Sequence, residues 1–143
     1  MSAMAAVEIV GLQVEPESGN PVVLLAEPGA HERVLPILIG PAEAQSIALA
    51  VAGLRTARPG THDLLVTLVE KADSRVQQVA VTELLDGVFF AELVFETPTG
   101  LHRISARPSD GIAVAIRVAA PIVVAESVLD EASTEISRTV TGF

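Results

Sequence analysis

Two short polar clusters interrupt a chain that is otherwise rich in apolar residues, and both hold side chains that could act on an anion. Residues 107–110 read RPSD and precede a long apolar segment, and residues 58–63 read RPGTHD. An arginine beside a helix start, such as Arg107, can bind a phosphate group. His62 is a candidate general base or acid, with Asp63 as a nearby carboxylate. These residue types favour chemistry on a phosphate as a first hypothesis.

The RPSD cluster also has a purely structural interpretation. If Pro108 is the first residue of a helix, Asp110 is the third. A carboxylate there can accept a hydrogen bond from the cap N–H and faces the positive end of the helix dipole. Glu43 has the same place in GPAEA, which favours capping for both acids. The counterpart of Arg107 is Gly40, so the fold requires no base there. Its structural alternative is a salt bridge to Asp63, to Asp110 or to a partner subunit.

The RPGTHD cluster can be interpreted in the same two ways. Adjacent residues point in different directions on a helix, so His62 and Asp63 are not an obvious catalytic dyad. In the structural interpretation, Thr61 caps a helix, Asp63 interacts with its dipole, and His62 packs or bonds across the sheet. In the functional interpretation, His62 is the base or acid, and Arg58 joins Arg107 in binding a scissile phosphate.

A divalent cation, Mg²⁺ or Mn²⁺, is the cofactor that phosphodiester chemistry could use here. Metal-assisted cleavage needs two or more converging carboxylates. Glu43, Asp63 and Asp110 all lie at expected helix starts, so they could converge at one end of a sheet. No HExxH motif, EF-hand loop, Cys/His cluster, P-loop or GxGxxG motif is present. No spacing therefore demands a metal, and nucleotide cofactors lack support.

The composition indicates one domain whose core is built from Val, Ile, Leu and Ala. The chain has 143 residues, half of them apolar, with 4 Phe and neither Trp nor Tyr. This length is enough for a sizeable core. Aliphatic cores of this kind often continue across subunit interfaces, so we expect a homo-oligomer, a dimer or higher. The absence of Cys excludes disulfides and thiolate chemistry.

The charge balance argues against a protein whose main task is to clamp nucleic acid. The chain has 18 acidic and 9 basic residues and a net charge of −9, whereas a clamp on phosphates is generally basic. Nucleic acid is still a partner to consider through a local basic patch, because Arg103, Arg107 and Arg117 lie within one short segment.

The chain is expected to be cytoplasmic and to have no membrane partner. Its first residues lack a basic segment followed by an apolar run, so no secretory signal is expected. The longest apolar run, residues 111–125, contains Arg117 and Pro121 and is shorter than a membrane-spanning helix.

The helices and strands that position these residues are expected to form two copies of one structural unit. Pro108 lies 67 residues after Pro41, and the same gap-free offset aligns Asp110 with Glu43. We interpret this offset as an internally duplicated β-β-β-α unit. The first copy is expected to have strands over 6–14, 21–27 and 33–39 and a helix over 41–53, and the second copy strands over 75–83, 88–95 and 101–106 and a helix over 108–119.

These elements predict an α+β fold, with a mixed or antiparallel sheet and packed helices. A further helix is expected between the copies, from Thr61, and a short strand and helix after the second copy, up to residue 132. Residues 1–132 then form a single domain with repeat halves at about 6–53 and 75–119, followed by a polar tail over 133–143. The two repeat helices are nearly apolar all round, which predicts burial at the centre or in an oligomer interface.

Four sequence blocks occur in a specific order along nearly the whole chain. They are LPILIGPAEAQSIAL at 35–49, RPGTHDLL at 58–65, DGVFFAEL at 86–93 and ARPSDGIAVAIRVAAPIVV at 106–124. Together they resemble the bifunctional nuclease family, a domain found in bacteria and plants, over about residues 7–126. The resemblance implies a compact, duplicated α+β domain that is usually oligomeric and hydrolyses both DNA and RNA.

The family motif carries over to individual positions of this chain, with two departures. The family usually has an acid where this chain has Ser105, and Ala where it has Gly111. If that acid were a metal ligand or a base, its loss would weaken the enzyme. The matching positions are Pro36, Gly40, Glu43, Ala44, Thr61, His62, Asp63, Arg107, Pro108, Ser109, Asp110 and Arg117.

Two hypotheses for the function follow. In the first, the chain is a nuclease in which Asp110, Glu43 and Asp63 hold a divalent ion or orient water. His62 is its base or acid, and Arg107 stabilises the phosphate. In the second, the chain is a non-enzymatic oligomeric binding or regulatory module with an anion site at the helix N-termini. The resemblance favours the first hypothesis, and the composition favours the second.

Overall fold

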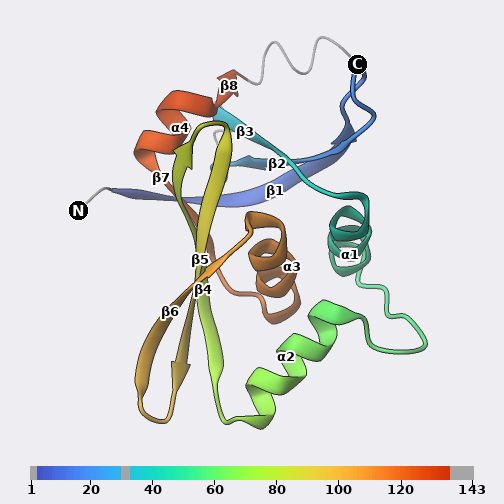
Figure 1. The fold of residues 1–143 in the computed structure, drawn as a ribbon, viewed down its shortest axis with the longest axis vertical. Coiled ribbons are helices and arrows are strands. Elements are labelled where there is room, and N and C mark those ends of the chain that lie inside the picture. The colour runs from blue at the N-terminus through green and yellow to red at the C-terminus, as the bar shows by residue number, and fades with distance from the viewer. Residues whose placement is uncertain (1–2, 30–32, 136–143) are drawn as a thin grey trace.

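The computed structural model describes residues 3–29 and 33–135, which contain four helices and one eight-stranded sheet (Figure 1). In chain order the elements are β1 (Met4–Val14), β2 (Pro21–Ala26), β3 (Arg33–Leu38), α1 (Pro41–Val51), α2 (Thr61–Lys71), β4 (Arg75–Leu85), β5 (Val88–Thr97), β6 (Gly100–Ala106), α3 (Pro108–Val118), β7 (Ile122–Ala125), α4 (Glu126–Ala132) and β8 (Thr134–Glu135). The strands lie in the order β6-β5-β4-β7-β1-β2-β3-β8.

The predicted α+β fold, with a mixed sheet and packed helices, is confirmed. In each half an antiparallel three-stranded meander precedes a helix: β1-β2-β3 before α1, and β4-β5-β6 before α3. Strand β7 joins the two meanders, antiparallel to β1 and parallel to β4. The duplication itself stays a prediction. Within the described ranges, none of the helices is long and apolar enough to cross a membrane. Most of the predicted tail, residues 136–143, lies outside the described residues.

Helix α3 forms the centre of the helical layer. Figure 1 shows it between the sheet and the two outer helices, and it packs against α1, α2, β4 and β5. Seven of its 11 residues are buried, Ile112 and Val114 among them, as predicted. Central burial is wrong for α1, because only one face of this outer helix packs on α3. Ile47 is its one buried residue in the described part of the chain. Burial of α1 in an oligomer interface stays a prediction.

Gly111 allows α3 to lie close to β4. A Cβ atom at this position would stand 2.7 Å from Cγ1 and 3.3 Å from Cγ2 of Val79, whose side chain is fully buried and has no freedom to swing aside. Overpacking of this kind costs about 1–3 kcal/mol, against a helix-propensity gain of about 1 kcal/mol for Gly→Ala. We therefore expect Gly111→Ala to lower the free energy of unfolding, as measured by urea denaturation.

The same substitution in a Val79→Ala background provides the control for this prediction. Removing the two Val79 methyl groups opens the space that the new Cβ needs, so Gly111→Ala should there be neutral or stabilising. An equal loss of stability in both backgrounds would show that the contact with Val79 is not the cause.

Candidate functional site

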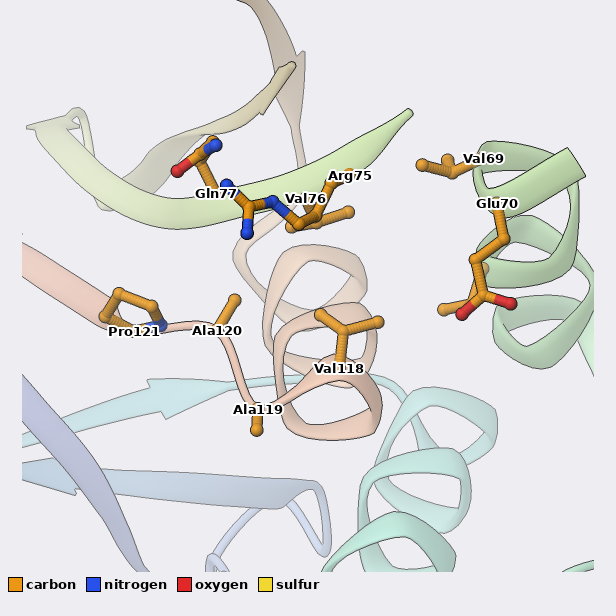
Figure 2. A pocket seen from close by; sticks show the side chains of 10 residues that line it. Val69, Glu70, Arg75, Val76, Gln77, Val118, Ala119, Ala120 and Pro121 are labelled. Carbon is orange, nitrogen blue, oxygen red and sulfur yellow. The ribbon is translucent and has the colours of Figure 1, made fainter. Parts of the chain in front are cut away.

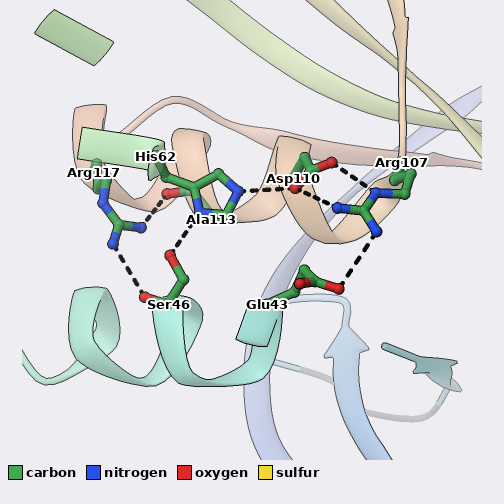
Figure 3. Close-up of polar contacts among 7 residues, drawn as sticks. All are labelled: Glu43, Ser46, His62, Arg107, Asp110, Ala113 and Arg117. Atoms are coloured by element: carbon green, nitrogen blue, oxygen red, sulfur yellow. Dashed lines mark hydrogen bonds and ion pairs between the residues drawn. The ribbon is translucent and has the colours of Figure 1, made fainter. Parts of the chain in front are cut away.

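Helices α1, α2 and α3 line one cavity of about 360 Å³, mostly with residues at or near their N-terminal ends. All of the predicted catalytic residues line it, namely Glu43, His62, Asp63, Arg107 and Asp110. Other polar residues of the lining are Gln45, Ser46, Thr61 and Arg117. Figure 3 shows most of these side chains in the space between α1, α3 and the start of α2. The structure therefore brings together residues from three separate stretches of the sequence.

Local sequence signals explain why the helices begin at this cavity. Pro41 and Pro108 occupy the first positions of α1 and α3, where a missing N–H costs nothing. The cap of α2 is Gly60 rather than the predicted Thr61, because the chain is still extended at Gly60 and turns helical one residue earlier than predicted. Asp63 lies in the first turn of α2, as predicted, and its Oδ2 accepts a hydrogen bond of 2.9 Å from the Gly60 N–H.

Arg107 links the starts of α1 and α3. Its Nε and Nη2 donate to the two oxygens of Asp110, at 2.8 and 3.2 Å, and its Nη1 donates to Glu43 Oε1 at 3.4 Å. Of the two predicted acidic partners, Asp110 forms the salt bridge, whereas Asp63 is paired with Arg117 instead. The hydrogen bond to Asp110 raises the pKa of Arg107. Its side chain is still 65% exposed. These three contacts leave part of the five-donor guanidinium available to an anion in the cavity.

His62 is buried between two polar side chains from other helices. Only 8% of its surface is exposed. Its Nε2 lies 2.9 Å from Asp110 Oδ1, and its Nδ1 lies 2.6 Å from Ser46 Oγ. Figure 3 shows His62 of α2 between the other two residues, with Ser46 on α1 and Asp110 on α3. The carboxylate of Asp110 therefore contacts His62 and Arg107 side chains, whereas the structural interpretation assigned it to a backbone cap.

Opposing effects act on the pKa of Asp110. Burial raises the pKa of this carboxyl, but the hydrogen bonds from Arg107 and His62 outweigh burial and hold the pKa below its usual range. Asp110 is therefore an anion at neutral pH. Its carboxylate faces Nε2 of His62, and this contact fixes the orientation of the imidazole ring.

Arg117 lines the cavity and connects the three helices through its hydrogen bonds. Its side chain is only 13% exposed, and its Nε donates to Asp63 Oδ1 at 2.6 Å. Its Nη1 and Nη2 donate to the backbone carbonyls of Ala113 and Ser46 at 2.8 and 3.2 Å. The hydrogen bond from Arg117, and next the one from the Gly60 N–H, hold the pKa of Asp63 below its usual range. Asp63 therefore serves Arg117 and the start of α2, not His62.

A divalent ion does not fit this arrangement of donors. Arg107 contacts the carboxylates of both Glu43 and Asp110, and Asp63 is paired with Arg117. Across residues 3–29 and 33–135, no group of three or more His, Cys, Asp or Glu side chains is placed to hold a metal ion. The use of Mg²⁺ or Mn²⁺ as a cofactor stays a prediction, which a cleavage assay with and without the metal can test.

Ser46 is absent from the predicted site residues, and Arg117 is predicted only as part of a basic patch and of the family motif. Helical spacing is the signal that could have found them, because residues three or seven apart share a helix face. Ser46 follows Glu43 by one turn, and Arg117 follows Asp110 by two turns. Arg58 does not line the cavity, so its predicted role in phosphate binding stays a prediction.

Ser105 and a second pocket lie away from this cavity. Ser105, which replaces the usual acid of the family, is exposed on β6 and does not line the cavity. A separate pocket of about 240 Å³ lies between α2, the start of β4 and the end of α3 (Figure 2). None of the predicted site residues lines that pocket. The cavity at the helix starts is therefore the candidate site.

Comparisons with known proteins identify the family of the chain. The bifunctional nuclease domain matches residues 22–137, which include every residue of the candidate site. Uncharacterized protein Rv1829 of Mycobacterium tuberculosis is 42% identical over 129 residues, covering 90% of this chain and 76% of that protein. Bifunctional nuclease 2 of Oryza sativa subsp. japonica is 30% identical over 117 residues, covering 78% of this chain and 36% of the rice protein. The chain therefore belongs to the bifunctional nuclease domain family.

Proposed function

We propose that the chain hydrolyses phosphodiester bonds of nucleic acid at the 360 Å³ cavity. The observation that carries this proposal is the buried His62, hydrogen-bonded on one side to an ionised carboxylate and on the other to a hydroxyl. The name of the rice relative, Bifunctional nuclease 2, supports the same class of reaction.

Each charged side chain has a role in the proposed reaction. The exposed guanidinium of Arg107 binds the scissile phosphate and stabilises the charge that develops on its oxygens. His62 takes a proton from the attacking group and gives one to the leaving oxygen. Asp110 holds the His62 ring and balances its charge. Glu43 orients Arg107 from the opposite helix.

A second cavity supports a nucleotide as the substrate. It has a volume of about 550 Å³, shares Glu43 and Arg107 with the first cavity, and continues along an apolar wall that includes Leu38, Val88 and Phe89. Nucleobases stack readily on aromatic rings. A phosphate bound by Arg107 would leave its neighbouring nucleoside beside this wall, and the contact would suit DNA and RNA alike.

Cleavage assays with purified variants test the proposal. Wild type, Arg107→Ala, Asp110→Ala and Lys71→Ala are compared on single-stranded DNA and RNA with Mg²⁺, Mn²⁺ or EDTA. Loss of a charge-stabilising donor costs about 10²- to 10³-fold in kcat, so we expect that loss for Arg107→Ala. The control residue, Lys71, is exposed at the end of α2 and does not line the cavity, so Lys71→Ala should have no effect.

Two outcomes decide the competing interpretations, and one further variant tests Arg58. Equal cleavage by all preparations would indicate a contaminating nuclease, and the proposed function would fall. Activity that disappears in EDTA and returns with Mg²⁺ or Mn²⁺ would support the predicted divalent cation. Arg58→Ala, added to the series, tests the predicted phosphate contact of that residue.

A further inference from the structure

The hydroxyl of Ser46 forms the free end of a three-residue hydrogen-bonded chain. The chain runs from Asp110 Oδ1 to His62 Nε2 over 2.9 Å, and from His62 Nδ1 to Ser46 Oγ over 2.6 Å. We infer that Ser46 is the nucleophile of this site and forms a covalent phosphoseryl intermediate with the substrate. The inference rests on the proposed function, because it names the group that attacks the phosphodiester.

The direction of the hydrogen bonds follows from the chemistry of the partners. An ionised carboxylate can only accept a hydrogen bond, and the pKa of Asp110 is held low. The neutral His62 ring must therefore carry its proton on Nε2, which leaves Nδ1 as an acceptor. The Ser46 hydroxyl then donates to Nδ1. This is the arrangement in which a histidine removes the proton of a serine while a carboxylate holds the ring.

The surroundings of Ser46 suit a nucleophile rather than a purely structural hydroxyl. Ser46 lines the same cavity as Arg107, whose guanidinium faces the solvent. His62 is almost completely buried, and its Nδ1 is directed to the Ser46 hydroxyl. The backbone carbonyl of Ser46 accepts a hydrogen bond from Arg117. This contact holds the turn of α1 that carries the hydroxyl against α3.

The proposed reaction has two balanced steps. In the first, Ser46 Oγ attacks phosphorus, the Oγ–P bond forms, and the bond to the leaving oxygen breaks. The serine proton passes to His62 Nδ1 and from there to the leaving oxygen. In the second step, water attacks phosphorus and gives a proton to Nδ1, the Oγ–P bond breaks, and Ser46 regains its proton. The sum is one diester and one water giving one phosphate monoester and one alcohol.

An enzyme-borne nucleophile is compatible with the proposed cleavage of both DNA and RNA. Many ribonuclease reactions use the ribose 2′-hydroxyl of RNA as the attacking group, and DNA lacks this hydroxyl. Attack by Ser46 needs no group from the sugar. One site could therefore cleave both DNA and RNA.

Stereochemistry at phosphorus gives the decisive measurement. Two successive in-line displacements retain the configuration of a chiral phosphorothioate diester, whereas direct attack by water inverts it. We expect retention, and we expect Ser46→Ala to lower kcat by about 10³-fold or more. Ser127→Ala, which removes an exposed hydroxyl on α4, is the matched control and should retain full activity.

A second measurement is independent of nuclease activity. A fluorophosphonate probe labels serines that a neighbouring base activates, and the modified residue is located by mass spectrometry. We expect labelling at Ser46 in wild type and its loss in His62→Gln. An active enzyme that inverts configuration, with Ser46→Ala unimpaired, would overturn the inference and leave the nuclease proposal standing. Labelling of Ser46 in a protein that cleaves no nucleic acid would support the nucleophile and overturn the nuclease proposal. Neither labelling nor cleavage would overturn both.

Discussion

His62→Gln is expected to lower kcat for phosphodiester cleavage by about 10²- to 10⁴-fold, the usual contribution of a positioned general acid and base. Glutamine has an acceptor and a donor, so it can keep hydrogen bonds to Ser46 and Asp110. It cannot take up a proton near neutral pH, so proton transfer is lost while the cavity retains its shape. Because Arg107 still binds the phosphate, KM should change little. Single-turnover and steady-state cleavage of a fluorescent oligonucleotide measure both constants.

His102→Gln is the matched control for this experiment. His102 lies on β6, where it stacks on Phe95 and is exposed, and it does not line the cavity. The same change of side chain there should leave kcat unaltered. If His62→Gln retained the wild-type kcat while remaining folded, His62 would have only a structural role in this cavity, and the proposed mechanism would be wrong.

Arg117→Met is expected to lower the free energy of unfolding by about 2–4 kcal/mol. Removal of one partner of a buried ion pair costs about 3–5 kcal/mol, and partial solvation of Asp63, whose side chain is 42% exposed, reduces that figure. The substitution also removes the donors to the carbonyls of Ala113 and Ser46. Methionine keeps the length of the aliphatic stem, so the loss reports the polar contacts. Urea denaturation measures the change.

The same variant should alter how stability depends on pH. The pKa of Asp63 is lower in the folded chain than in the unfolded chain, so its contribution is present above the unfolded-state value of about 3.9. That contribution is lost as the pH falls through the lower folded-state pKa. Without Arg117 the folded-state pKa of Asp63 rises toward its unfolded-state value. The decline in stability below about pH 5 should therefore be shallower in Arg117→Met, with Asp110 still contributing in both proteins.

Arg103→Met removes the same charge from an exposed position on β6 and is the control. It should change the free energy of unfolding by less than about 0.5 kcal/mol. A double-mutant cycle with Asp63→Asn isolates the interaction between Arg117 and Asp63. The losses of unfolding free energy in the two single variants should sum to more than the loss in the double variant. Strict additivity would contradict the contact between Arg117 and Asp63.

Local sequence rules were enough to predict the elements and the helix starts that line the candidate cavity. Pro41 and Pro108 mark the starts of two helices because proline suits the first helical turn, and both helices begin there. The acids Glu43, Asp63 and Asp110 lie in the first turns, as the helix dipole favours. These signals depend on neighbours within a few residues, so they can be interpreted without knowledge of the tertiary structure.

The identity of each side chain's partner depended on the tertiary structure. His62 and Asp63 are adjacent in the sequence, yet His62 contacts Ser46 and Asp110 while Asp63 contacts Arg117. Successive residues point in directions about 100° apart on a helix, so each side chain meets a different neighbouring helix. The packing of α1 and α2 on α3 decides which residue of the neighbouring helix each side chain contacts. Contacts between Asp110 and a histidine 48 positions away leave no periodic signal in the chain, because they arise only when the apolar faces of the helices are buried together.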